Sequence, residues 1–159
     1  MKRVNWLRLA GCVGLCLAAG LIGSFFTVSA IPTWYATLVK PAFSPPNWLF
    51  GPVWTTLYIM MGAALYIVRE HSANKKLVAD ASLWFALQLA LNAAWSILFF
   101  GLHSPALGLA CIAAMWLAIA VTMAKFRKIS RNAFLLLVPY IAWVSFAMIL
   151  NASLWLMNP

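Results

Sequence analysis

Aromatic and amide side chains recur at helical spacing inside one long uncharged stretch of the sequence. Between residues 81 and 101 they stand three or four positions apart, at Trp84, Gln88, Asn92, Trp95 and Phe99. This spacing puts all of them on one face of a helix. Rings that stack and amides that donate and accept hydrogen bonds suit a flat, largely apolar ligand with a few polar groups.

Similar side chains occur in three other uncharged stretches, at Trp54 and Tyr58, at Trp116, and at Trp143, Ala147 and Asn151. If the stretches cross a membrane as helices, a rise of about 1.5 Å per residue puts the four tryptophans and Asn92 roughly 9 to 20 Å below its surface. A buried amide or indole N–H at that depth needs a partner. Either these groups satisfy one another in a packed core or they line a cavity, and the spacing alone leaves both open.

Side chains for acid–base, nucleophilic or metal chemistry are scarce. Glu70 and Asp80 are the acidic residues, and they fall in or beside one expected connection together with His71, whereas His103 falls in another connection on the opposite side of the membrane. Cys12 and Cys16 stand four apart, as metal ligands can, but no third ligand accompanies them, so packed thiols are the favoured interpretation. We therefore expect no metal site, no required cofactor and no conventional hydrolase or transferase, and a proton-coupled pump is disfavoured.

The elements that must position these side chains follow from the composition. The chain of 159 residues is 65% hydrophobic and 8% charged, whereas soluble domains carry about 25% charged residues. Uncharged stretches cover residues 9–31, 46–68, 81–101, 105–124 and 132–157. Each is about 20 residues or longer, enough to cross a hydrocarbon core of about 30 Å. The sequence predicts one all-α domain over residues 1–159, an integral membrane bundle of five transmembrane helices.

The charge distribution predicts the orientation of this bundle. With five spans, Lys40 is the only one of the eleven Lys and Arg residues expected on its side of the membrane. The others, Lys2 and Arg3 among them, fall on the opposite side, which the positive-inside rule assigns to the cytoplasm together with the N-terminus. The net charge of +9 is thus explained by membrane topology and anionic lipid, and no nucleic-acid partner is expected.

Small residues also recur four apart, for example at Ala86, Ala90 and Ala94. Such stripes let helices approach closely in a membrane. They predict close packing and, through the third span, a homodimer.

Three segments together resemble one known family. They are LVKPAFSPPNWLFGPVWTTLY at residues 38–58, preceded by Trp34 and Tyr35, then QLALNAAWS at 88–96, and PYIAWVSFA at 139–147, followed by Leu150 and Asn151. In this order they are similar to the first-loop, second-, third- and fifth-helix motifs of the TspO/MBR family. This is the family of tryptophan-rich sensory proteins and translocator proteins, also called peripheral-type benzodiazepine receptors.

The resemblance implies a five-helix membrane protein, often dimeric, that binds porphyrins and other tetrapyrroles, sterols and benzodiazepine-type ligands in a pocket closed by its first loop. Matched motif by motif, the implied ligand-binding residues are Tyr35, Trp54, Tyr58, Asn92, Trp95, Trp116, Trp143 and Ala147. The implied lid loop contains Lys40, Pro41, Pro45 and Pro46. High-affinity sterol binding is not expected, because residues 150–157 lack the Tyr and the basic residue of the animal sterol motif.

Three functions remain open at this point. The favoured one is a membrane receptor or sensor for porphyrins and related flat ligands, with a role in tetrapyrrole homeostasis and stress response. The second is a transporter of porphyrins or sterols. The third is light- and oxygen-dependent porphyrin degradation, which the resemblance implies and in which Trp54 and Trp143 would take part photochemically.

Overall fold

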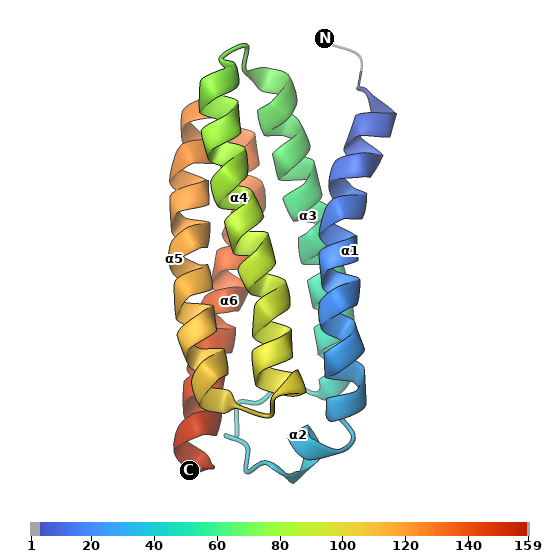
Figure 1. Cartoon of the computed structure of the whole chain (residues 1–159), viewed down its shortest axis with the longest axis vertical. Helices are drawn as coiled ribbons and strands as arrows, with labels where there is room; N and C mark the ends of the chain where they lie inside the picture. The colour runs from blue at the N-terminus through green and yellow to red at the C-terminus, as the bar shows by residue number, and fades with distance from the viewer. Residues whose placement is uncertain (1–3, 159) are drawn as a thin grey trace.

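The computed structural model describes residues 4–158, and their regular structure is helical throughout (Figure 1). The long helices are α1 (Trp6–Ala30), α3 (Phe50–His71), α4 (Lys75–Ser96), α5 (Pro105–Ile129) and α6 (Arg131–Met157). All five are long and apolar enough to cross a membrane. This confirms the predicted all-α, five-span membrane bundle.

The helices extend beyond the uncharged stretches at one end of the bundle. α4 begins at Lys75 rather than near residue 81, because the Asn74 side chain accepts a hydrogen bond from the Leu77 N–H and caps the helix there. α5 continues to Ile129, and Ser130 then caps α6. Hydropathy marks the part of a helix that lies in lipid, whereas caps mark where the helix itself begins.

The connection between α1 and α3 contains structure that the prolines did not indicate. A single helical turn, α2 (Trp34–Thr37), follows α1, and a 3₁₀ turn at Asn47–Leu49 leads into α3. At the end of α4 the backbone widens into a π-helical turn at Ile97–Gly101 before the sharp connection to α5. These turns lie at the end of the bundle that is marked by α2 in Figure 1.

Around the bundle, packed neighbours follow the order α1, α3, α6, α5, α4 and back to α1. The contact between α1 and α3 depends on a glycine. A Cβ atom on Gly62 would lie 2.5 Å from the Cα of Val13 and 2.9 Å from the carbonyl oxygen of Cys12. Only a residue without a side chain allows the two backbones to approach this closely.

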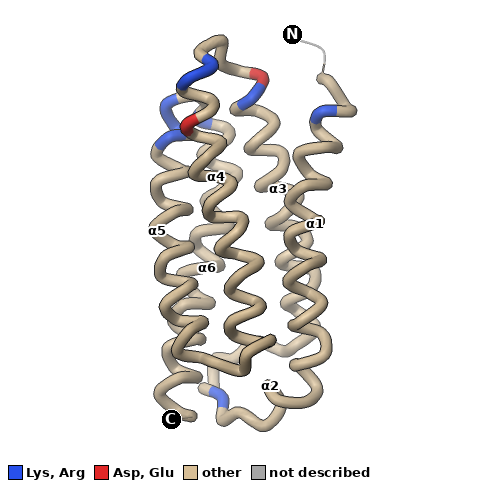
Figure 2. Tube along the Cα trace, in the orientation of Figure 1, with Lys and Arg blue, Asp and Glu red and all other residues tan. Residues whose placement is uncertain are grey.

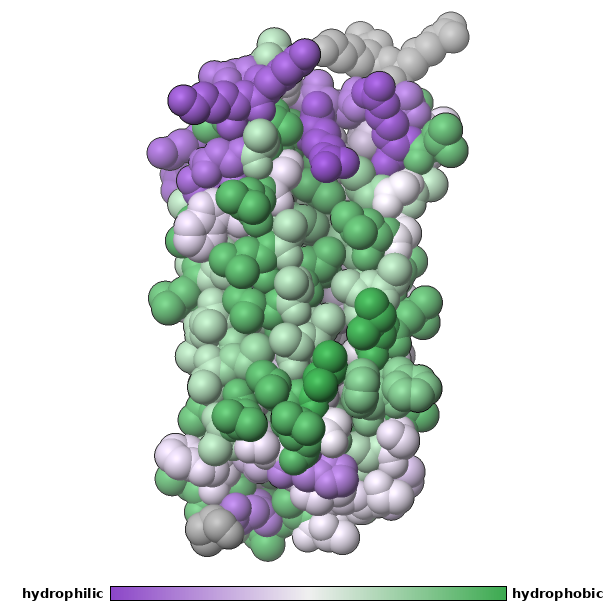
Figure 3. Space-filling view, viewed as in Figure 1, coloured by the Kyte–Doolittle hydropathy of each residue, from purple (hydrophilic) through white to green (hydrophobic). Residues whose placement is uncertain are grey.

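The surface shows how the bundle sits in a membrane. Large apolar side chains such as Leu7, Phe25 and Leu83 are exposed on its sides. Figure 3 shows a hydrophobic band between two more polar ends. Lys and Arg gather at one end, and Lys40 is the basic residue beside α2 at the other (Figure 2). Lys2 and Arg3, counted with the basic end above, lie outside the described residues, and which end faces the cytoplasm stays a prediction.

Candidate functional site

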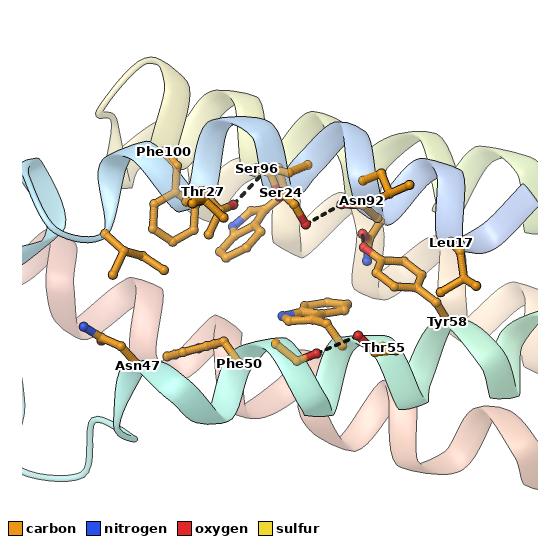
Figure 4. Close-up of a pocket in the computed structure, with 18 of the residues that line it drawn as sticks. Leu17, Ser24, Thr27, Asn47, Phe50, Thr55, Tyr58, Asn92, Ser96 and Phe100 are labelled. Carbon is orange, nitrogen blue, oxygen red and sulfur yellow. Dashed lines mark hydrogen bonds between the residues drawn. The ribbon is translucent and has the colours of Figure 1, made fainter. Parts of the chain in front are cut away.

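A cavity of about 620 Å³ lies between α1, α3 and α4, in the half of the bundle nearer α2. This volume is in the range of sites that hold drug-sized ligands. Figure 4 shows Tyr58 and Asn92 meeting at one end of the cavity, with Phe100, Asn47 and Phe50 toward the other. The lining residues are Leu17, Gly20, Leu21, Gly23, Ser24, Thr27, Val28, Ile31, Tyr35, Asn47, Trp48, Phe50, Gly51, Trp54, Thr55, Tyr58, Asn92, Trp95, Ser96 and Phe100.

Two tryptophans supply the aromatic walls. Trp54 on α3 stacks on Tyr58 one turn further along, with ring centroids 5.6 Å apart. Trp95 on α4 stacks on Phe99 at 5.3 Å, and its indole N–H donates to Asn151 Oδ1 at 3.1 Å. Because neighbours hold both rings, the cavity offers fixed flat surfaces to a flat ligand.

The inner end of the cavity is a chain of hydrogen bonds with one consistent direction. The Tyr58 hydroxyl donates to Asn92 Oδ1 at 2.5 Å, and Asn92 Nδ2 donates to the Tyr140 hydroxyl at 3.1 Å. Tyr140 in turn donates to Gln88 Oε1 at 2.7 Å. Each hydroxyl has one proton to give, so the bond from Tyr140 to Gln88 makes Tyr140 an acceptor toward Asn92. Gln88 thereby fixes, through Tyr140, which way the Asn92 amide points.

This network decides what the cavity can offer a ligand. Asn92 uses one N–H on Tyr140 and keeps the second, and the Tyr58 oxygen keeps acceptor capacity after donating its proton. Gln88 and Asn92 are only 1% and 3% exposed. The network therefore offers one donor and one acceptor at the inner end of a mostly apolar cavity, which suits a ligand with few polar groups.

α1 closes the cavity with small side chains. A Cβ atom on Gly20 would overlap the Tyr58 ring, and one on Gly23 would lie 2.8 Å from Ser96 Oγ. These glycines let α1 lie directly against α3 and α4. The sequence-based prediction did not include them or their neighbours Ser24 and Thr27, because α1 carries neither amides nor tryptophans at this depth. Two glycines three positions apart in an otherwise bulky stretch were the available signal.

The cavity is also open along one side of the bundle. Leu21 and Val28 on α1 and Trp48 before α3 line it, yet they are 71%, 69% and 72% exposed. A residue that lines the cavity and also faces outward marks an opening. The cavity thus reaches the lipid-facing surface between α1 and α3.

The segment around α2 covers the remaining end. Tyr35 lines the cavity and is buried, and the Lys40 ammonium lies 4.8 Å from the centre of its ring. Burial raises the pKa of Tyr35 above its ordinary value of 10.0, so its hydroxyl is neutral at physiological pH. The predicted lid residues Pro41, Pro45 and Pro46 belong to this segment but do not line the cavity.

Contacts with the end of α6 and with the turn before α5 hold the segment in place. The backbone N–H of Val39 donates to Asn158 Oδ1 at 2.9 Å, and Asn158 Nδ2 donates back to the Val39 carbonyl at 3.0 Å. Trp34 stacks on His103 with ring centroids 4.7 Å apart. His103 has a positive φ of 53°, which few residues other than glycine adopt. The lid segment is therefore tied to α6 and to the turn before α5.

The structure brings together five of the eight predicted ligand-binding residues: Tyr35, Trp54, Tyr58, Asn92 and Trp95 all line the cavity. The other three, which lie on α5 and α6, do not line the cavity. Trp116 donates its indole N–H to Ser145 Oγ at 2.8 Å, and Ala147 is buried in the core. Trp143 packs behind Phe50 at 6.1 Å, and its indole nitrogen has no hydrogen-bond partner in residues 4–158.

Comparison of the sequence with known proteins shows the family of this chain. The sequence is 50% identical over 153 residues to the Tryptophan-rich protein TspO of Chlorobaculum tepidum, covering 96% of this chain and 97% of that protein. It is 37% identical over 155 residues to the Tryptophan-rich sensory protein of Cereibacter sphaeroides, covering 98% and 94%. To the human Translocator protein it is 38% identical over 148 residues, covering 90% and 87%. A sequence model of the TspO/MBR family matches residues 12–156, and the chain belongs to that family.

Proposed function

We propose that this membrane protein is a receptor that binds porphyrins and similar flat, apolar ligands in the cavity between α1, α3 and α4. One observation carries the proposal, namely an aromatic cavity of about 620 Å³ with a directional polar network at its inner end. The family names, sensory protein and translocator protein, support a role as a membrane receptor or sensor. They name no ligand, so the ligand rests on the cavity.

In this proposal each wall has a defined task. The ring of the ligand stacks against Trp54 and Trp95, which are held by Tyr58 and Phe99. A polar substituent of the ligand accepts a hydrogen bond from the free N–H of Asn92. The opening between α1 and α3 admits apolar molecules from the bilayer, and the α2 segment keeps water out. No acid, base or metal is needed for such binding.

A titration with protoporphyrin IX in the dark tests the proposal. Binding is followed by porphyrin absorbance, so that removing a tryptophan does not alter the signal itself. We expect saturable binding that Trp54→Ala weakens at least about tenfold, because about 1.4 kcal/mol corresponds to that factor and a stacked ring contributes comparably. Trp6→Ala is the matched control, since Trp6 is 73% exposed at the opposite end.

Two results would reject the ligand assignment. One is the absence of saturable binding by the wild-type protein. The other is an equal loss of affinity in Trp54→Ala and Trp6→Ala, which would mean that porphyrin adsorbs to exposed tryptophans generally.

Transport is the second candidate, because the cavity is open toward the bilayer at Leu21 and Val28. A transporter must also release its ligand on the other side. Vesicles loaded with porphyrin and containing the protein would then show flux that stops in Trp54→Ala. Saturable binding without protein-dependent flux would leave the receptor as the function.

A further inference from the structure

The basic end of the bundle carries more positive charge than the chain can neutralise. The whole sequence has eleven Lys and Arg residues but two carboxylate side chains, Glu70 and Asp80. Both are already used, Glu70 by Arg8 at 2.8 Å and Asp80 by Lys125. No acidic side chain is left for Arg127 or Lys128 at the end of α5. Their counter-charge must come from outside the protein.

These two residues stand at the mouth of a groove. It is an open groove of about 510 Å³ between the ends of α5 and α6, lined by Ala120, Met123, Ala124, Arg127, Lys128, Phe134 and Ile141. Apart from the two cations, its walls are entirely apolar. Ala120 and Ala124 form part of the α5 wall, and Phe134 and Ile141 form the α6 wall.

One of the cations is held over the apolar wall. The Arg127 guanidinium carbon lies 5.6 Å from the centre of the Phe134 ring. This cation–π contact keeps the charge beside the groove while leaving its N–H donors available. Guanidinium groups bind phosphate through paired N–H donors, and the neighbouring Lys128 adds a second charge.

The groove also points in a definite direction. From Arg127 to Ala120 on α5, and from Phe134 to Ile141 on α6, the walls run about 10 Å along the helices at about 1.5 Å per residue. They lead from the charged end toward the hydrophobic band of Figure 3. A molecule that matches this groove has an anionic group at one end and an apolar chain at the other.

We propose that the groove between α5 and α6 binds one anionic phospholipid, with its phosphate at Arg127 and Lys128 and an acyl chain along Phe134 and Ile141. The site is separate from the ligand cavity, which lies between α1, α3 and α4 in the other half of the bundle. It therefore does not depend on the proposed receptor function. It differs from general attraction between basic residues and anionic lipid because it needs both the charges and the groove.

Native mass spectrometry tests the charges first. The protein is released from detergent containing equal amounts of phosphatidylglycerol and phosphatidylcholine with identical acyl chains. We expect the wild type to retain one phosphatidylglycerol, and Arg127→Gln with Lys128→Gln to lower that retention at least about tenfold. Lys75→Gln with Lys76→Gln is the matched control, because it removes the same charge at the same end but away from the groove.

A second pair of measurements tests the groove. Ala124→Phe fills it without changing any charge, and Ala124 is exposed, so the fold tolerates the larger ring. We expect this variant to lose phosphatidylglycerol as the double Gln variant does, and glycerol phosphate, which has no acyl chain, not to displace the lipid. Thermal unfolding of each variant at the wild-type temperature confirms that the bundle is intact.

Equal losses in the two double Gln variants would overturn the proposal, because the lipid would then respond to total charge. Full retention in Ala124→Phe would overturn it as well, because the groove would have no part in binding. Displacement by glycerol phosphate would identify a site for free phosphate rather than for a lipid.

Discussion

Both sides of the bundle contain tryptophans within their membrane-spanning helices, yet the ligand cavity described above lies on one side. On the α3 and α4 side, Trp54 and Trp95 line open space. On the α5 and α6 side, Trp116 is bonded to Ser145, and Trp143 packs behind Phe50. The residue types match, so residue type does not separate a binding wall from a packed core. The neighbouring helix decides, and α1 faces the cavity with glycine and small polar residues.

The largest effect on the difference between the two sides is expected from adding a side chain to α1 where this helix meets the cavity. A Cβ atom on Gly20 overlaps the Tyr58 ring. Gly20→Ala therefore pushes that ring toward the cavity and strains its bond to Asn92, at a cost of roughly 1 to 3 kcal/mol for overpacking. We expect porphyrin affinity to fall about tenfold or more.

Gly14→Ala on the same helix is the control, because nothing lies within 4 Å of the Cβ it adds. It is expected to leave affinity unchanged and to stabilise the helix slightly, since alanine is the better helix former. Unchanged affinity in Gly20→Ala, measured with thermal unfolding to show an intact fold, would mean that the Tyr58 end takes no part in binding.

Buried hydroxyl groups give a second, smaller test of the two sides. Tyr140→Phe leaves Asn92 Nδ2 and Gln88 Oε1 without their shared partner, and Ser145→Ala does the same to the Trp116 indole N–H. An unsatisfied buried group costs about 1 to 3 kcal/mol. Both variants should therefore unfold at lower temperature.

Only Tyr140→Phe should change ligand binding, by a few-fold, because the Asn92 amide is then free to turn. Equal affinity in Tyr140→Phe and Ser145→Ala would show that the orientation of Asn92 is irrelevant to the ligand. The Gln88→Leu variant separates orientation from bulk, since it keeps the Tyr140 ring and removes the group that accepts its proton.

The sequence predicted one side of this comparison better than the other. Spacing in residues 81–101 placed Gln88, Asn92 and Trp95 on a common face, and the structure joins them to the cavity or its network. A depth count along α5 and α6 was equally regular, but depth does not say which neighbour a side chain faces. The choice of neighbour depends on the order of helices around the bundle, which no single helix encodes.

The contacts of the lid segment and the role of Gly20 also could not be predicted from the sequence alone. The resemblance implied a lid loop with three prolines, whereas the pairing of Asn158 with Val39 that holds this loop joins residues 119 positions apart. A glycine such as Gly20 has no chemistry of its own to mark it. Its role appears only when Tyr58 is placed against it.

The photochemical alternative also distinguishes the two sides. Trp54 lines the cavity, so its indole can give an electron to an excited porphyrin bound there, whereas Trp143 does not line the cavity and packs against Phe50, which does. Under light and air, Trp54→Phe should slow porphyrin breakdown several-fold and Trp143→Phe much less. The measurement is the loss of porphyrin absorbance in samples first brought to equal occupancy. Equal slowing in both variants would contradict the distinction.

The smallest effect on ligand binding is expected at the lid, where Asn158 at the end of α6 bonds to Val39 in the segment between α1 and α3. Asn158→Ala removes its two hydrogen bonds to Val39, at 2.9 and 3.0 Å. Partly exposed bonds contribute about 0.5 to 1.5 kcal/mol each, so the lid should open more often and porphyrin should dissociate a few-fold faster in stopped-flow measurements. Asn132→Ala, exposed at the other end of α6, is the control. If both variants release ligand at the wild-type rate, ligand leaves between α1 and α3, and the lid only closes the end of the cavity.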